Sequence, residues 1–272
     1  MKTMTLTGRC RDLVCFSSPL AAMVILCTIA TGCGSSDSEI LVQPQVSQDG
    51  TRYYDIGEIV NNTDIHPRPP ALMALTTSGT QVSGTVMSDS LGGYGVISGA
   101  VDEAARKMNL VMTFDSGPVM QCTVEMFPSG GWALDSCTIT DGARVWTGWP
   151  QYLDPESHSA ADYGVTDAGC AAIVIANNSP AFAIRSVRLR GTADHFDREY
   201  DGIAKGGNMV YTVPAGAYYV EVSYSEHSGN WTYANTLYDS VAAAAGTAVV
   251  FALEGGSYSD GIMYHAPDFE KK

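Results

Sequence analysis

The chain has 272 residues, with 15 Lys and Arg against 29 Asp and Glu, and a net charge of −14 at pH 7. This balance argues against binding to nucleic acid or adhesion to anionic lipid, because both need clustered basic side chains. Hydrophobic residues make up 45% and charged residues 16%. With abundant Gly, Thr, Ser, Val and Tyr, that composition favours short strands and tight turns over helices, in a chain long enough for two domains.

Residues 1–32 have the layout of a secretory signal. Lys2, Arg9 and Arg11 precede an apolar run at 20–30, and Ala-Thr-Gly at 30–32 leads to Cys33. This ending resembles the bacterial lipobox, in which small residues precede an invariant cysteine. The resemblance implies cleavage before Cys33, a diacylglycerol on its sulfur and an acyl chain on its amino group. An uncleaved transmembrane helix over residues 13–32 and plain secretion are the alternatives.

Lipidation would anchor the mature chain, residues 33–272. Two or three acyl chains meet the condition for stable anchoring, which a single chain does not. Residues 33–50 then form a polar tether. Gly34 stands where an Asp would favour inner-membrane retention in the enterobacterial pattern, so the outer membrane is favoured. The signal takes away three basic residues and one acidic residue, which leaves a net charge of −16 and suits solubility outside the cytoplasm.

Residues 51–149 predict an up-and-down meander of about eight strands. The strand-like runs lie at 53–60, 71–77, 81–88, 95–101, 108–114, 119–127, 132–140 and 144–149. Val-Ser-Gly-Thr-Val at 82–86 recurs as Ile-Ser-Gly-Ala-Val at 97–101, and a glycine in mid-strand marks a bend or a close backbone approach. On these glycine motifs the stretch resembles the small lipocalin-like β-barrels of bacterial envelope proteins, which implies a closed barrel.

Two cysteines fall on one predicted hairpin. If Phe127 pairs with Trp132 across the loop at 128–131, Cys122 faces Cys137 directly. In an oxidising periplasm this register predicts a cross-strand disulfide. Two buried free thiols are the alternative, and the role of Cys170 stays open.

Residues 150–169 predict an inter-domain linker, and 170–254 a β-sandwich of six to seven strands. The strand-like runs lie at 171–176, 182–190, 209–213, 217–224, 230–238 and 247–253. Ala-Asn-Asn-Ser at 176–179 and Val-Pro-Ala-Gly-Ala-Tyr-Tyr-Val at 213–220 resemble the prealbumin-like and carboxypeptidase-regulatory-like sandwiches of secreted bacterial proteins. The resemblance implies a Pro-Ala-Gly turn that feeds a strand with a core tyrosine. Residues 255–272 predict a loose C-terminal tail.

No nucleophile elbow, His-Glu-x-x-His helix, P-loop or dinucleotide-binding glycine motif occurs, and the five histidines are scattered. We therefore expect no enzymatic activity, no metal and no cofactor. Aromatic residues are richest in the barrel region, where a small barrel presents a ligand mouth or packs its core. The expected mouth residues are Trp132, Trp146, Trp149 and Tyr94.

The second half carries three polar or aromatic features. The acidic run at 194–201 predicts a solvated loop, with a Ca²⁺ site as the alternative. Arg188 and Arg190 share a strand face by period two and Arg185 lies opposite; we expect these arginines to pair with acids or protect a sheet edge rather than to receive an anionic partner. Tyr218 and Tyr219 point to opposite faces, so one of them marks a contact surface.

Together these features predict a lipid-anchored protein of the bacterial cell envelope with a non-catalytic role in binding or assembly. Its partners would be membrane lipid, through Cys33, and an envelope protein or polysaccharide. The alternatives are a secreted hydrolase, an accessory domain of one, or a lipocalin-like carrier of a small ligand.

Overall fold

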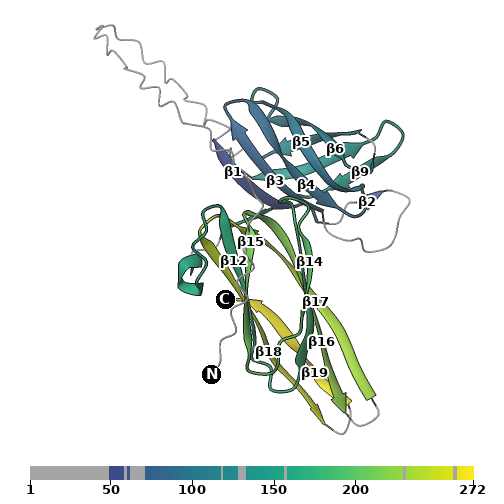
Figure 1. Cartoon of the computed structure of the whole chain (residues 1–272). Helices are drawn as coiled ribbons and strands as arrows, with labels where there is room; N and C mark the ends of the chain where they lie inside the picture. The colour runs from purple at the N-terminus through teal and green to yellow at the C-terminus, as the bar shows by residue number, and fades with distance from the viewer. Residues whose placement is uncertain are drawn as a thin grey trace, which may run out of the picture.

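The computed structural model describes residues 49–57, 60–61, 71–117, 119–127, 133–155, 158–228, 231–259 and 262–272. These residues form nineteen strands and one short 3-10 helix, so the described chain is all-β, as the composition predicts. Strands β1 to β10 make one unit and β11 to β19 a second unit, which lies against it (Figure 1). No helix among the described residues is both long and apolar enough to cross a membrane.

The first unit is one curled sheet in which β3 to β9 form a meander, each strand antiparallel to the next. Its order is β10-β1-β3-β4-β5-β6-β7-β8-β9-β2. The strands are β1 (Gly50–Asp55), β2 (Val60–Asn61), β3 (Ala71–Ser78), β4 (Gln81–Ser88), β5 (Gly93–Asp102), β6 (Lys107–Phe114), β7 (Val119–Met126), β8 (Leu134–Thr140), β9 (Val145–Gly148) and β10 (Gln151–Leu153). The predicted strands of this region are therefore confirmed where the structure describes them, except that the run at 53–60 is not one strand: β1 ends at Asp55, and residues 56–57 lie outside any strand.

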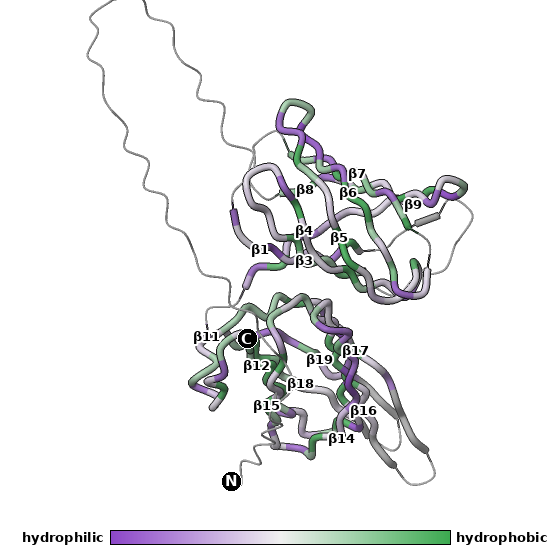
Figure 2. The backbone as a smooth tube through the Cα atoms, turned by 45° about the horizontal axis from the view of Figure 1, so that its top comes forward, coloured by the Kyte–Doolittle hydropathy of each residue, from purple (hydrophilic) through white to green (hydrophobic). Residues whose placement is uncertain are grey.

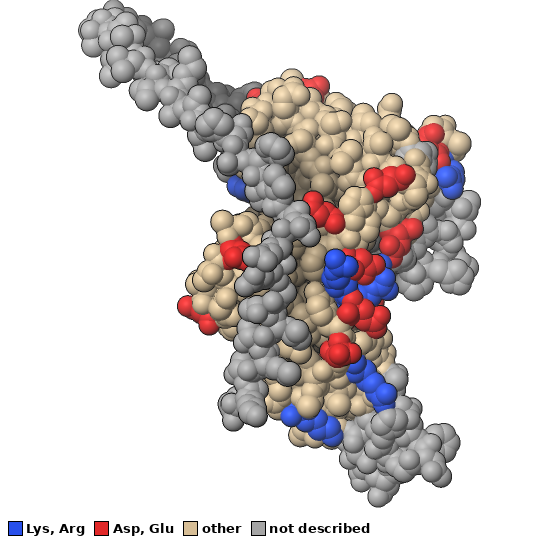
Figure 3. All heavy atoms as spheres, viewed as in Figure 1, with Lys and Arg blue, Asp and Glu red and all other residues tan. Residues whose placement is uncertain are grey.

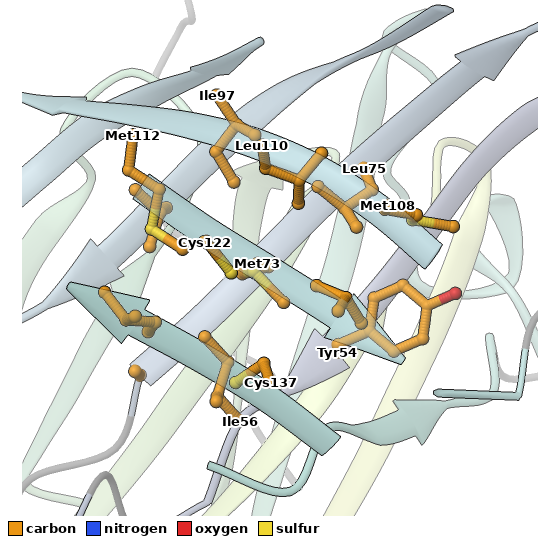
Figure 4. Close-up of a cluster of buried hydrophobic side chains, with 14 of the residues drawn as sticks. Tyr54, Ile56, Met73, Leu75, Ile97, Met108, Leu110, Met112, Cys122 and Cys137 are labelled. Carbon is orange, nitrogen blue, oxygen red and sulfur yellow. The ribbon is translucent and has the colours of Figure 1, made fainter. Parts of the chain in front are cut away.

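The curl of this sheet encloses an apolar core. In β6, Met108, Leu110 and Met112 are buried while Asn109 and Val111 are exposed, because successive side chains of a strand point to opposite faces. The inward side chains of the meander form one cluster (Figure 4). Alternation in the sequence thus gives the sheet one apolar face to wrap around.

Two chain segments bring the ends of the curled sheet together. Strand β9 pairs with β8, and after Trp149-Pro150 the chain continues as β10, which pairs with β1. The Trp149 N–H donates to the Ile56 carbonyl at 3.1 Å. A Cβ on Gly148 would lie 2.5 Å from the Ile56 side chain, so glycine permits the approach.

The recurring glycines Gly84 and Gly99 mark close backbone approaches, as predicted. A Cβ on Gly84 would lie 2.0 Å from the Ala74 carbonyl oxygen, and one on Gly99 would lie 2.2 Å from that of Asn109. Each glycine therefore lets its neighbouring strand come closer than a side chain would allow.

The second unit has two sheets that share one core. The strands are β11 (His158–Ser159), β12 (Cys170–Asn177), β13 (Ala183–Gly191), β14 (Asp197–Asp201), β15 (Asn208–Pro214), β16 (Gly216–Ser228), β17 (Trp231–Ala243), β18 (Thr247–Ser259) and β19 (Ile262–Lys271), with the 3-10 helix η1 (Ala160–Tyr163). One sheet has the order β11-β18-β12-β15, with β19 beside β18, and the other has the order β14-β13-β16-β17. Strand β12 runs parallel to β18.

Apolar side chains from both sheets fill the space between them. Ile173 and Phe251 come from the first sheet, and Val187 and Val220 from the second. Figure 2 shows hydrophobic residues recurring along the strands of both units. The two sheets therefore hold together by burying their facing apolar surfaces.

The prediction of a loose C-terminal tail is wrong. Strand β19 pairs antiparallel with β18, and the Phe269 ring stacks on Phe251 with centroids 4.7 Å apart. Gly255 and Gly256 stand at the start of the segment predicted as a tail. Both glycines adopt positive φ values of 64° and 78° inside β18, so the strand continues through them.

The segment predicted as a linker is paired at both ends, and part of the acidic run forms a strand. Residues 151–153 pair with β1, and residues 158–159 pair with β18. Asp197–Asp201 forms β14, an edge strand beside β13, and not a solvated loop. The charges that suggested a loop are the kind that protect a sheet edge.

A β-bulge corrects the predicted position of Arg185. The register of β13 on β16 shifts between Ile184 and Ser186, so simple period two fails there. The Arg185 Nε donates to the Ser225 hydroxyl, and Ser225 shares its strand face with Glu221, which lies opposite Arg188. All three arginines therefore lie on the same outer face.

Candidate functional site

The predicted mouth aromatics do not come together among the described residues. Trp146 is buried in the core of the curled sheet, whereas Trp149 is 56% exposed. Tyr94 lies at the junction of the two units, and Trp132 falls outside the described residues. The core-packing alternative is correct for Trp146, and nothing in the sequence spacing distinguished Trp146 from Trp149.

The predicted disulfide is also wrong. Cys122 lies opposite Ile139, and Cys137 lies opposite Val124. Met126 pairs with Leu134 rather than with Ala133, and the register shifts by one more residue between Met126 and Glu125. Cys122, Cys137 and Cys170 are all buried and none is in a disulfide. A hydrogen bond with the Cys137 thiol, together with burial, holds the pKa of Cys122 well above its usual value. The predicted lipidation site, Cys33, lies outside the described residues.

The two units meet at a junction that brings distant parts of the chain together and that we call the seam. Its apolar part combines residues from β1, β3 and β4 with residues from β16 and β17. They are Tyr53, Leu72, Met87, Ala217, Tyr219 and Ala242, none more than 7% exposed. The predicted contact tyrosine is therefore Tyr219, while Tyr218 lies in the core of the second unit.

Polar contacts surround this apolar part. The Tyr94 hydroxyl donates to the Phe196 carbonyl at 2.9 Å, and Arg190 pairs with Asp89 across the seam. The Arg190 guanidinium also lies over the Tyr219 ring, 5.3 Å from its centroid. Figure 3 shows basic and acidic side chains gathered beside this junction. The expectation that the arginines pair with acids is confirmed for Arg190 here and for Arg188 below.

The connection between β13 and β14 contacts the first unit at the seam. Asp194 and His195 both adopt left-handed backbone conformations, with φ of 45° and 56°. Asp and His are among the residue types that tolerate this region best. His195 Nδ1 lies 3.0 Å from Asp115 of the first unit, and its ring lies 4.9 Å from that of Tyr94.

Arg188 fixes the base of this connection. Its Nε and Nη2 donate to the two carboxylate oxygens of Asp197 at 2.9 and 2.8 Å, a bidentate pair. These hydrogen bonds lower the pKa of Asp197. Burial, followed by the charge of Asp197, raises the pKa of Tyr94.

A small cleft opens between the two units beside these contacts. It encloses about 150 Å³ and is lined by Thr85, Tyr94, Gly95, Val96, Asp115, Thr192, Asp194 and His195. The lining combines two carboxylates, three hydroxyls and an imidazole with the exposed side chain of Val96. Such a mixture suits a small hydroxyl-rich ligand, whose C–H groups pack on apolar atoms while its hydroxyls bond to the polar ones.

Two buried polar atoms near the seam have no hydrogen-bond partner among the residues that the structure describes. One is the hydroxyl of Ser88, the residue before Asp89 in the first unit. The other is the Nε of Arg190, the residue of the second unit that pairs with Asp89. Within the described residues, no group of three His, Cys, Asp or Glu side chains is arranged to hold a metal ion. Any ligand recognition at the seam would therefore rely on hydrogen bonding and on the shape of the cleft.

A second hollow lies beside η1. It is shallow, about 430 Å³, and lined by small residues of 159–169 and 245–246 with Asp167 as its carboxylate. It offers fewer convergent polar groups than the seam cleft. No protein-family model and no curated protein matches the chain.

Proposed function

We propose that the chain is a lipid-anchored, non-catalytic binding protein of the bacterial cell envelope, with a closed β-barrel followed by a β-sandwich. Its anchor is Cys33, at the end of the secretory signal. The seam cleft is its recognition site, and the ligand is a sugar unit of an envelope polysaccharide.

Two features support the proposed architecture. The hydrogen bond from Trp149 to Ile56 links the first and last parts of the meander, as closure of a barrel requires. In the second unit, with β12 counted as the first strand of the sandwich, β12 is antiparallel to the fourth strand, β15, and parallel to the seventh, β18. That order is the one found in prealbumin-like sandwiches, which the hairpin at 213–220 resembles.

The binding role rests on the convergence of Tyr94, Asp115, Asp194 and His195 in a cleft between two units. Ligand sites in proteins occur preferentially at domain interfaces, in concave regions with a few convergent polar groups. The left-handed backbone at Asp194 and His195 is held by the Arg188–Asp197 pair and by the Tyr94 hydrogen bond. The carrier alternative has less support, since inward side chains of nearly every strand fill the interior of the curled sheet.

The binding test uses the intact chain and a panel of neutral, acidic and amine-bearing oligosaccharides, with calorimetry or ligand-observed NMR as the readout. Asp194→Asn keeps a residue that tolerates the left-handed backbone but removes the charge. A bound sugar should then lose at least about tenfold in affinity, as expected for a hydrogen bond to a charged group.

Asp135→Asn is the matched control, because it removes an exposed carboxylate on β8, away from the cleft residues. It should bind like the wild type. If no sugar of the panel binds, or if both variants bind equally, the cleft does not have the proposed role.

The anchor is tested separately. Cys33→Ser, or inhibition of lipoprotein signal peptidase, should move the protein out of the membrane fraction or leave its precursor unprocessed. Unchanged processing and fractionation would refute the lipid anchor without bearing on the cleft.

A further inference from the structure

Strand β17 forms a long, regular edge of the second unit (Figure 1). It pairs with β16 from Trp231 to Ala243 with no register shift and contains no proline. An edge strand of this kind presents free N–H and C=O groups, which template pairing with a strand of another chain. Its length therefore makes β17 a point at which two copies could join.

Hydrogen bonding on the other side of β16 shows which groups of β17 face the free edge. The Thr192 N–H donates to the Ala217 carbonyl, so Ala217 and alternate residues after it face β13. The residues between them face β17, where their partners include Val220 with Asp239 and Val222 with Leu237. The groups left facing the free edge belong to Thr232, Ala234, Thr236, Tyr238, Ser240 and Ala242.

Three of these six positions, all from Thr236 onwards, are covered by the chain itself. The Thr236 N–H donates to Asn235 Oδ1, and the Ser240 N–H donates to Asp239 Oδ1, each at 2.8 Å. Pro155, which has no N–H, forms an isolated bridge beside Ala242. The same pattern of side-chain capping therefore recurs four residues apart along the exposed edge.

We propose that Asn235 and Asp239 act as edge guards that prevent β17 from pairing with a second copy of this chain. A local side-chain acceptor offers the backbone N–H an alternative to a strand ladder. A second strand would have to break both hydrogen bonds before forming its own. In the other sheet, β19 protects its edge in a different way, with Pro267 and the charged Asp268 and Glu270.

The test compares two double variants in the full chain carrying Cys33→Ser, which removes the acyl chains. N235A/D239A removes both acceptors. N235D/D239N exchanges the two side chains and so keeps an Oδ1 at each position with unchanged net charge. Sedimentation velocity over a concentration series measures self-association, and circular dichroism checks the fold.

The alanine pair should self-associate at least about tenfold more tightly than the wild type, the effect expected when two hydrogen bonds no longer compete. The exchanged pair should sediment like the wild type. The proposal is wrong if the alanine pair folds and sediments like the wild type, or if the exchanged pair associates as strongly as the alanine pair.

Amide hydrogen exchange in the wild type gives a readout that does not depend on a folded variant. The amides of Thr236 and Ser240 should exchange more slowly than that of Tyr238, although all three face the same edge. Equal exchange at the three amides would refute the capping on which the proposal depends.

Discussion

Leu72 and Leu75 form a matched pair that tests whether the seam is a separate energetic element. Both lie on β3 and both are 0% exposed. They face opposite ways: Leu75 packs inside the curled sheet, whereas Leu72 packs against the second unit. Substitution to alanine should therefore remove a similar amount of packing energy at each position, but it should destabilise different parts of the molecule.

Each Leu→Ala change should cost about 2–5 kcal/mol, from lost apolar burial and the cavity left behind. Opening the first unit alone breaks its own core and the seam. Opening the second unit alone breaks its own core and the same seam. Leu72→Ala weakens the shared seam, so it should lower the opening free energy of both units by similar amounts. Leu75→Ala should lower that of the first unit only.

Native-state hydrogen exchange followed on peptides from β5–β7 and from β12 and β18 measures the two opening free energies separately. The reasoning fails if Leu72→Ala leaves protection of the second unit within about 0.5 kcal/mol of the wild type, since a seam residue must matter to both sides. It also fails if Leu75→Ala reduces protection equally in both units.

Three further predictions concern the described residues. Gly99→Ala should destabilise the first unit by about 1–3 kcal/mol or more, because its Cβ would meet the Asn109 carbonyl at 2.2 Å, while Gly117→Ala, whose nearest contact is 3.4 Å, should cost much less in a denaturant titration. The Arg188–Asp197 pair lowers the folded-state pKa of Asp197, so the stability that it contributes should be present above about pH 4 and be lost as the pH falls further. Because both side chains are partly exposed, Asp197→Asn should lower the free energy of unfolding by under about 1 kcal/mol at pH 7. The variant should also lose less stability than the wild type on acidification, and an unchanged acid dependence would contradict the pairing. Cys122, Cys137 and Cys170 are buried thiols, so without reductant all three should resist alkylation in the native protein and all three should react once it is denatured; a denatured protein that takes up fewer labels there would show a disulfide.

Local pattern was enough to predict most strands of this chain and not enough to predict their register. Alternation in 108–114 and the glycines at 84 and 99 correctly indicate a curled antiparallel meander. The pairing of Cys122 with Cys137 assumed a regular hairpin with Phe127 opposite Trp132. Met126 instead pairs with Leu134, one residue off that register, and a further shift between Glu125 and Met126 moves the two cysteines out of opposition. A bulge between Ile184 and Ser186 misplaced Arg185 for the same reason. Bulges have weak local signals, because any residue can be the extra one.

Local composition gave the wrong secondary structure where charged residues or glycines occur both in loops and in strands. The acidic run at 194–201 suggested a solvated loop and residues 255–272 a loose tail, yet Asp197–Asp201 and the glycines at 255–256 belong to strands. In β14 the charges protect an edge, and in β18 the glycines permit a positive φ within a strand that continues. A sequence window cannot separate these cases, because the deciding neighbour, β13 or β19, comes from another part of the chain.

The candidate site could not be predicted from the sequence, because its residues come from parts of the chain that lie even further apart. The hydrogen bond from Tyr94 joins residues 102 positions apart, and the Arg190–Asp89 pair joins residues 101 apart. Each member alone has an ordinary explanation: a barrel tyrosine, an arginine on a strand, an aspartate in a turn. What distinguishes them is that two separate hydrophobic cores place them on facing surfaces, where the connection with left-handed backbone at 194–195 places His195 beside Asp115. Recognition at the seam would therefore be sensitive to docking of the units. Leu72 does not itself line the cleft, yet Leu72→Ala should weaken binding of any cleft ligand along with the protection of both units.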